Sequence, residues 1–170
     1  MPSIGHEILG SLFDTHARAL LLYARQWSRG SEAEDVVQEA FASLARQEDL
    51  PEQVVPWLFR TVRNAAISAA RSRQRRWRRE ERASSPEAWF SAADDRIDGR
   101  EATRLLAELE PDLREVVVAR IWGGLTFEQI AALQGCSLTT AHRRYQSGLA
   151  GLQERLDRPC ATASIPLRTT

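Results

Sequence analysis

The residues of this chain that could do chemistry are hydroxyls, amides and arginines rather than a catalytic set. The segment LTFEQIAALQGCSLTTAHRR, residues 125–144, places such side chains just after a tight turn. Side chains of this kind donate to base edges or phosphates when a helix end lies in a DNA major groove. The candidates are Thr139, Thr140, His142 and Arg143. The pattern is typical of a helix-turn-helix, with an ordinary helical hairpin as the alternative.

Local signals mark the two helices of this segment. Thr126 can cap the first helix, and Gln129 three residues later completes a capping box. Gly135 supplies the turn, because glycine adopts positive φ without steric cost. Ser137 is a favourable N-cap for the second helix. Spacings of three and four predict that this second helix faces the core with Ala141, Tyr145, Leu149, Leu152 and Leu156.

A second cationic segment lies upstream. Residues 60–82 are rich in arginine and contain only Glu80 and Glu81 as acids, although the net charge of the chain is zero. Acidic residues collect instead at 32–39 and 87–98. This segregation is typical of a protein with one face for a polyanion and other faces for different partners.

Other classes of protein are disfavoured. Cys136 and Cys160 are too few and too far apart for a zinc site or a disulfide framework. His6, His16 and His142 are scattered, and neither a phosphate loop nor a catalytic triad is present, so we expect a non-enzymatic protein without a cofactor. The sequence has no signal peptide and no run approaching the ~20 apolar residues of a membrane span, which predicts a soluble cytoplasmic chain.

Weak strand signals and abundant Ala, Leu, Arg, Glu and Gln predict an all-α fold. The first helix is expected over 7–28. A second begins at Ser31, with Glu34 as its capping-box partner, and a third starts near Pro56 after a loop at 47–56. Helix resumes at Arg100 and again at Pro111. The chain is thus predicted to form two small helical bundles, 5–80 and 99–157, joined by a flexible acidic linker, 81–98, and followed by a disordered tail, 158–170.

Three stretches resemble those of a known family. AEDVVQEAF at 33–41, PWLFRTVRNAAI at 56–67, and LEPDLREV at 109–116 with TAHRR at 140–144 occur in the order and at the separation found in small bacterial RNA polymerase sigma factors of the extracytoplasmic-function type. Each stretch is moderately specific, and together they cover both bundles. The resemblance implies an alternative sigma factor that binds core RNA polymerase and directs promoter-specific initiation.

The resemblance also implies roles for individual residues. The second helix would dock on the clamp helices of the largest polymerase subunit through Asp35, Gln38, Glu39 and Phe41. The third helix would recognise and melt the minus-ten element through Trp57, Phe59, Arg60, Arg63, Asn64, Arg71, Arg75 and Arg76. The helix-turn-helix would bind the minus-thirty-five element through Thr126, Thr139, Thr140, His142, Arg143 and Arg144. Partners would be core polymerase, including its flap, promoter DNA and, as for many family members, an anti-sigma factor.

Some positions depart from the family pattern or have a second interpretation. Ser68 stands where Asp is common, and His142 and Ser147 stand where basic residues are common, which leaves promoter preference open. Trp57 is equally well interpreted as a core anchor. The alternative function is a stand-alone helix-turn-helix regulator, which would bind duplex DNA without polymerase.

Overall fold

The computed structural model describes residues 4–28, 30–80 and 104–157, the side chains of 77–80 excepted. All regular structure in these ranges is helical. The elements are α1 (His6–Ala24), α2 (Ser31–Ala45), α3 (Val54–Glu80), a helical turn at 104–107, α5 (Pro111–Ile121), α6 (Phe127–Gln134) and α7 (Leu138–Leu156). The all-α prediction is therefore confirmed, while the predicted linker 81–98 and tail 158–170 lie outside the described residues.

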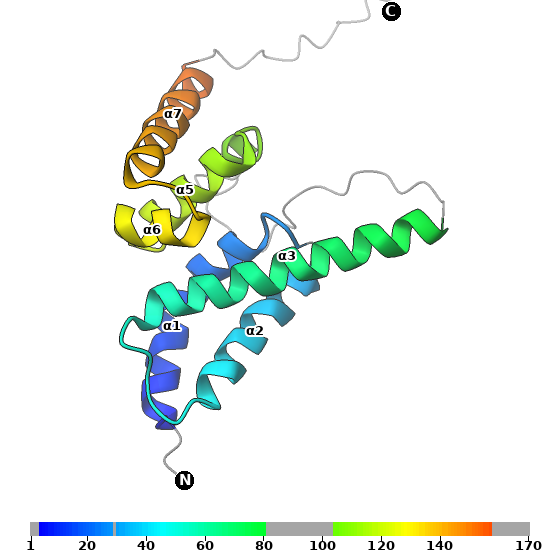
Figure 1. The fold of residues 1–170 in the computed structure, drawn as a ribbon, viewed down its shortest axis with the longest axis vertical. Coiled ribbons are helices and arrows are strands. Elements are labelled where there is room, and N and C mark those ends of the chain that lie inside the picture. Colours follow the sequence, from blue (N-terminus) through cyan, green and yellow to red (C-terminus); the bar gives the residue numbers. More distant parts are fainter. Residues whose placement is uncertain (1–3, 29, 81–103, 158–170) are drawn as a thin grey trace, which may run out of the picture.

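The helices form two groups (Figure 1). Helices α1, α2 and α3 pack against one another as the first lobe, and α5, α6 and α7, with the turn at 104–107, form the second lobe. Each helix of the first lobe contributes an apolar stripe to the core. The central residues are Leu20, Tyr23, Val37, Leu44, Leu58 and Val62, which are buried. The far half of α3 extends beyond this bundle.

The second lobe is built around α5. Val116, Val117 and Val118 are buried one after another, because α6 and α7 pack on one side of α5 and the first lobe packs on another. Gly148 of α7 lies against this helix, and a Cβ placed there would lie 2.6 Å from Val117 Cγ2. The close approach of α7 to α5 therefore depends on the absence of a side chain at position 148.

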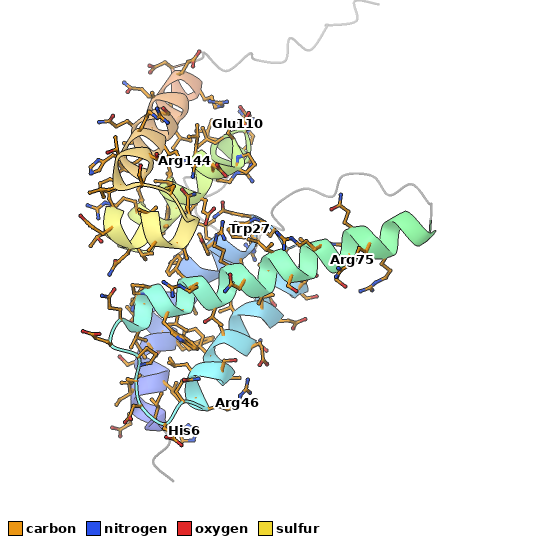
Figure 2. The ribbon with its side chains drawn as sticks, in the orientation of Figure 1. His6, Trp27, Arg46, Arg75, Glu110 and Arg144 are labelled. Atoms are coloured by element: carbon orange, nitrogen blue, oxygen red, sulfur yellow. The ribbon has the colours of Figure 1, made fainter. Side chains whose placement is uncertain are left out.

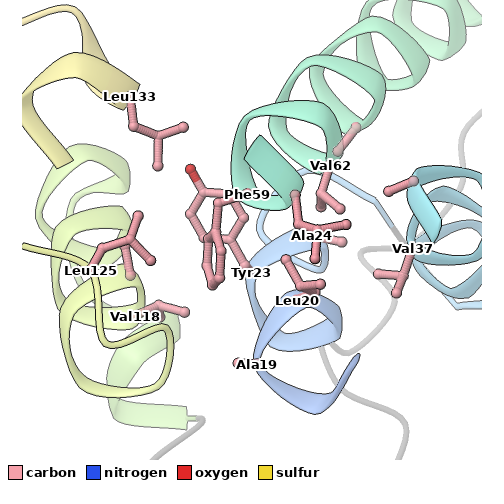
Figure 3. Close-up of a cluster of buried hydrophobic side chains, with 14 of the residues drawn as sticks. Ala19, Leu20, Tyr23, Ala24, Val37, Phe59, Val62, Val118, Leu125 and Leu133 are labelled. Atoms are coloured by element: carbon pink, nitrogen blue, oxygen red, sulfur yellow. The ribbon is translucent and has the colours of Figure 1, made fainter. Parts of the chain in front are cut away.

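The two lobes also touch each other. Helix α1 contacts α5, and α3 contacts α6, so that the buried side chains of both lobes make one continuous cluster. Figure 3 shows Tyr23 and Phe59 of the first lobe facing Val118, Leu125 and Leu133 of the second. Two groups of helices were predicted, and their mutual packing is an additional finding of the structure.

Several predicted boundaries and contacts are corrected. Helix α1 ends at Ala24, before the predicted Ser28, and α3 begins at Val54, so that Pro56 lies inside its first turn. Gly30 precedes α2, which begins at Ser31 without a side-chain cap, so the predicted Ser31–Glu34 capping box is wrong. In α7, Leu149 and Leu156 are exposed, at 37% and 62%, because the close α5 contact is made at Gly148.

Candidate nucleic-acid interface

The turn of the helix-turn-helix has the geometry that its sequence predicts. Thr126 Oγ accepts a hydrogen bond from the Gln129 amide at 3.3 Å, and Gln129 Oε1 accepts one from the Thr126 amide at 2.9 Å. The predicted capping box at the start of α6 is thus confirmed. Gly135 then adopts φ 66° and ψ 37°, the left-handed conformation that ends α6 and redirects the chain.

The start of α7 presents polar groups to the surface. The Ser137 hydroxyl caps the helix by accepting from the Thr140 amide at 3.2 Å, as predicted. Thr139, His142 and Arg143 are exposed, whereas Thr140 is half-buried and shares a 2.8 Å hydrogen bond with the Ser137 hydroxyl. The first turns of α7 therefore offer a hydroxyl, an imidazole and a guanidinium to a ligand outside the protein.

Arg144 has a different environment from its neighbour Arg143. Its guanidinium lies 2.5 Å from the Asp112 carboxylate and donates to Gln134 Oε1 at 2.9 Å. These contacts join α7 to the start of α5 and the end of α6 (Figure 2). Arg144 was predicted as a DNA contact, and in this structure its guanidinium is engaged in contacts that hold three helices of the second lobe together.

An aromatic stack supports the exposed side of α7. The His142 ring lies on the Phe127 ring with centroids 3.7 Å apart, and Tyr145 meets Phe127 edge-on at 5.4 Å. The Arg120 guanidinium lies 4.8 Å from the Phe127 ring centroid. Because Phe127 belongs to α6, this stack fixes the imidazole relative to both helices of the motif, a contact that sequence spacing did not indicate.

Helix α3 presents only part of its predicted minus-ten set. Arg60 and Asn64 are exposed one turn apart, and Trp57 is half-buried and packs against the core. Phe59 is fully buried, and Arg63 is half-buried, because the second lobe covers this side of the helix. Spacings of three and four predict one shared exposed face for Arg60, Arg63 and Asn64. Arg63 departs from that prediction.

A polar cluster explains the position of Arg63. Glu115, on α5, is buried, and its Oε1 accepts from the Tyr23 hydroxyl at 2.5 Å and from Arg63 Nε at 2.7 Å. Burial, followed by the nearby Glu115 carboxylate, raises the pKa of Tyr23 well above its ordinary value, so its hydroxyl stays protonated. Burial lowers the pKa of Arg63, but the hydrogen bond and charge of Glu115 outweigh it and raise the pKa overall. The cluster is thus an ion pair with a neutral phenol donor.

The far half of α3 carries exposed arginines. Arg71, Arg75 and Arg76 are exposed, and Arg75 points away from the rest of the molecule (Figure 2). Arg73 instead lies 2.9 Å from the Glu32 carboxylate and donates to the Trp27 carbonyl oxygen at 2.9 Å. Arg73 therefore anchors the helix to the bundle, while Arg71, Arg75 and Arg76 extend a cationic surface outward.

The predicted docking residues on α2 separate into exposed and buried members. Asp35, Gln38 and Glu39 are exposed along one side of the helix, and Phe41 is 92% buried, meeting Phe13 edge-on at 5.0 Å. A hydrogen bond from Arg46 at 2.6 Å, and the charge of Arg46, lower the pKa of the Glu39 carboxyl. Phe13, 43% exposed beside Phe41, is an apolar surface residue that the sequence interpretation missed.

No group of His, Cys, Asp and Glu residues in the described ranges is arranged to hold a metal ion. Within the same ranges, none of the helices combines the length and apolar character that a bilayer span requires.

Comparisons with known proteins agree with this geometry. Residues 12–76 match the family model for sigma-70 region 2, and residues 99–152 match that for sigma-70 region 4. The chain is 35% identical over 154 residues to the RNA polymerase sigma factor CarQ of Myxococcus xanthus, a match that covers 85% of this chain and 87% of that protein.

Two solved structures share the fold. The sigma factor RpoE, in complex with the anti-sigma factor NepR from Bartonella quintana, superposes with a TM-score of 0.72 at 24% identity over 91% of this chain and all of that one. CnrH, in complex with the cytosolic domain of CnrY, gives a TM-score of 0.63 at 24% identity over 90% of each chain. From these matches and the helix-turn-helix geometry, the chain belongs to the sigma-70 family of RNA polymerase sigma factors, in its extracytoplasmic-function group.

Proposed function

We propose that this sigma factor divides promoter recognition between its lobes, with the first lobe opening the minus-ten element and the second binding the minus-thirty-five element. Members of its family bind core RNA polymerase and direct initiation at specific promoters, and this chain is an alternative sigma factor of that kind. The observation that carries the proposed division is the start of α7, where Thr139, His142 and Arg143 are exposed beside a fully capped turn. A rigid helix end with exposed donors suits readout of an intact major groove.

The first lobe supplies what strand opening needs. Arg60 and Asn64 are exposed on α3, and Arg71, Arg75 and Arg76 continue the same helix as a cationic surface. Cations follow the DNA backbone, and aromatic side chains hold unstacked bases, each stack contributing roughly 1–3 kcal/mol. Trp57 lies on the same helix and is only half-buried, so it is our candidate for stacking.

Docking on core polymerase is assigned to the exposed side of α2. Asp35 and Gln38 are exposed without a role in the core of the lobe, and an acidic surface suits an arginine-bearing partner helix. We assign the action of the protein to binding alone, in the cytoplasm and without a covalent step. An anti-sigma factor is a further partner of this proposal, since the similar RpoE was solved with the anti-sigma factor NepR bound, and CnrH with the cytosolic domain of CnrY.

Run-off transcription with purified core enzyme tests the proposal as a whole. We expect the chain to direct core polymerase to discrete start sites whose upstream sequences share two elements. A stand-alone regulator would bind duplex DNA equally well without core enzyme, and that result would contradict the sigma assignment of these surfaces.

The docking assignment has its own test. The double variant Asp35→Ala, Gln38→Ala should weaken binding to core polymerase in a pull-down while leaving the helical circular-dichroism spectrum unchanged. Asp14→Ala is the matched control, because Asp14 is an exposed acid of α1 outside the proposed surface. Equal binding by the double variant and the wild type would remove α2 from the docking role.

A further inference from the structure

A carboxylate of the second lobe is buried where the two lobes meet, and both of its hydrogen-bond donors belong to the first lobe. Glu115 is 3% exposed on α5, in the second lobe, whereas Tyr23 and Arg63 belong to the first. Carboxylates are rarely buried unless they are paired and hydrogen-bonded, because desolvation of the charge is costly. Its charge is therefore compensated, in this structure, by residues that only the packed arrangement brings near.

The same contacts occupy residues that would meet DNA. Arg63 donates to Glu115, and its guanidinium also lies 5.9 Å from the Trp27 ring centroid. Phe59 is fully buried against the second lobe, and its Cζ would lie 2.5 Å from a Cβ placed at Gly123. While the lobes remain packed in this way, Phe59 is closed off from solvent and the half-buried Arg63 guanidinium is held by Glu115.

We propose that this packed arrangement is a closed resting state, in which Glu115 acts as a lock that withholds Arg63 and Phe59 from DNA. The inference rests on the proposed role of α3 in promoter opening. A DNA phosphate competes with Glu115 for the same guanidinium, so contact between α3 and the promoter requires the lobes to part. Any partner that binds the parted form more tightly than the closed form shifts the equilibrium toward the parted form. The size of the shift is set by the ratio of the two affinities.

The helix-turn-helix can survive this parting. Gln129 Nε2 donates to Gln53 Oε1 across the interface at 3.1 Å, while Gln129 Oε1 accepts from the Thr126 amide within the capping box. The two bonds use different atoms of one side chain. Loss of the contact with Gln53 therefore leaves the cap of α6 in place, and opening exposes the first lobe without unfolding the second.

The test replaces the lock by an isostere. Glu115→Gln keeps the volume of the side chain but removes its charge, and we expect the open fraction to rise roughly tenfold, as for the loss of a charge-assisted hydrogen bond. Spin labels on Ser11→Cys of α1 and Gln153→Cys of α7, both exposed positions, report the separation of the lobes by pulsed electron resonance. Cys136 and Cys160 are replaced by serine in this background.

Two further variants keep the result interpretable. Glu108→Gln is the matched control, because Glu108 pairs with Arg155 at 3.2 Å inside the second lobe, and its label distances should remain those of the wild type. Tyr23→Phe removes the other hydrogen bond to Glu115 and should also broaden the distances, by less. It replaces Glu115→Gln if that variant fails to fold.

The outcomes separate the lock from the proposed function. Distances that lengthen in Glu115→Gln, with more run-off transcript at limiting core enzyme, support both. Lengthened distances without transcription from any variant or the wild type support the lock and contradict the promoter role of α3. Distances that stay unchanged in both lock variants, or a wild type that is already broadly distributed, overturn the lock even if transcription is normal.

Discussion

The two lobes expose their proposed DNA-binding residues in opposite ways. In the second lobe, the start of α7 lies at the surface, and its capping bonds and aromatic stack are complete within the lobe. In the first lobe, part of the predicted α3 surface is covered, and Arg63 is paired with a residue of the other lobe. Under the proposed roles, the surface for duplex readout is assembled in this state, while part of the surface for strand opening is covered. The difference indicates that the two recognition events need not be available at the same time.

The largest expected effect tests whether the lobes are separate folding units. Ile130 is fully buried in α6, so Ile130→Ala should cost about 2–5 kcal/mol of stability in the second lobe. Hydrogen exchange should then show lost amide protection in α5 to α7 and retained protection in α2. Equal loss in both lobes would show that they unfold together, and the comparison between them would need to be redrawn.

Gly148→Ala tests the tight contact between α5 and α7. The new methyl would lie 2.6 Å from Val117 Cγ2, and overpacking of this kind costs about 1–3 kcal/mol. Thermal unfolding of the second lobe should move to lower temperature. Gly10→Ala, on α1, is the control: no atom lies within 4 Å of the added methyl, so this variant should be slightly stabilised.

Substitutions of two neighbouring arginines on α7 distinguish a role in DNA binding from a role in packing within the lobe. Arg143→Ala, at an exposed position, should lower transcription roughly tenfold with the fold intact, as for the loss of one specific base contact. Arg144→Ala should instead lower thermal stability, because it removes the ion pair with Asp112 and the hydrogen bond to Gln134 Oε1. If a promoter with a scrambled minus-thirty-five element responds equally to Arg143→Ala, the assignment of Arg143 is wrong.

The smallest expected effect concerns the capping box. Thr126→Ala removes the hydroxyl that accepts from the Gln129 amide, at a cost of about 1 kcal/mol. Thr126→Ser keeps the hydroxyl and should restore most of the stability. A loss of promoter binding in Thr126→Ser at unchanged stability would point to a role of the threonine methyl in DNA contact.

Local chemistry made much of the second lobe predictable. The helix caps and the turn of this lobe are formed between residues that are only a few positions apart. Their roles therefore follow from sequence spacing alone, and the residues are Thr126, Gln129, Gly135 and Ser137. The buried face of α2, with Val36, Val37, Ala40 and Leu44, likewise follows from spacings of three and four along that one helix.

What depends on contacts distant in sequence was not predictable. Glu115 follows Arg114 and directly precedes the apolar run 116–119, and nothing near it in sequence reveals that Tyr23, 92 positions away, donates to it. Leu149 was expected in the core because it lies four residues after Tyr145 and three before Leu152, but the α5 contact is made at Gly148, whose lack of a side chain permits close approach. The exposure of the α7 leucines and the covering of the α3 surface have the same cause. Both are set by how whole helices pack, which single-helix periodicity does not encode.

Helix α3 runs unbroken from Val54 to Glu80, a length of roughly 40 Å, which is slightly more than one turn of B-form DNA. Because the helix is continuous, side chains near its two ends point in fixed directions relative to one another around the helix axis. Deleting one residue between Asn64 and Arg71 would rotate the exposed arginines by about 100° around the helix axis. The separation of these positions along the chain is therefore constrained as strictly as their identities.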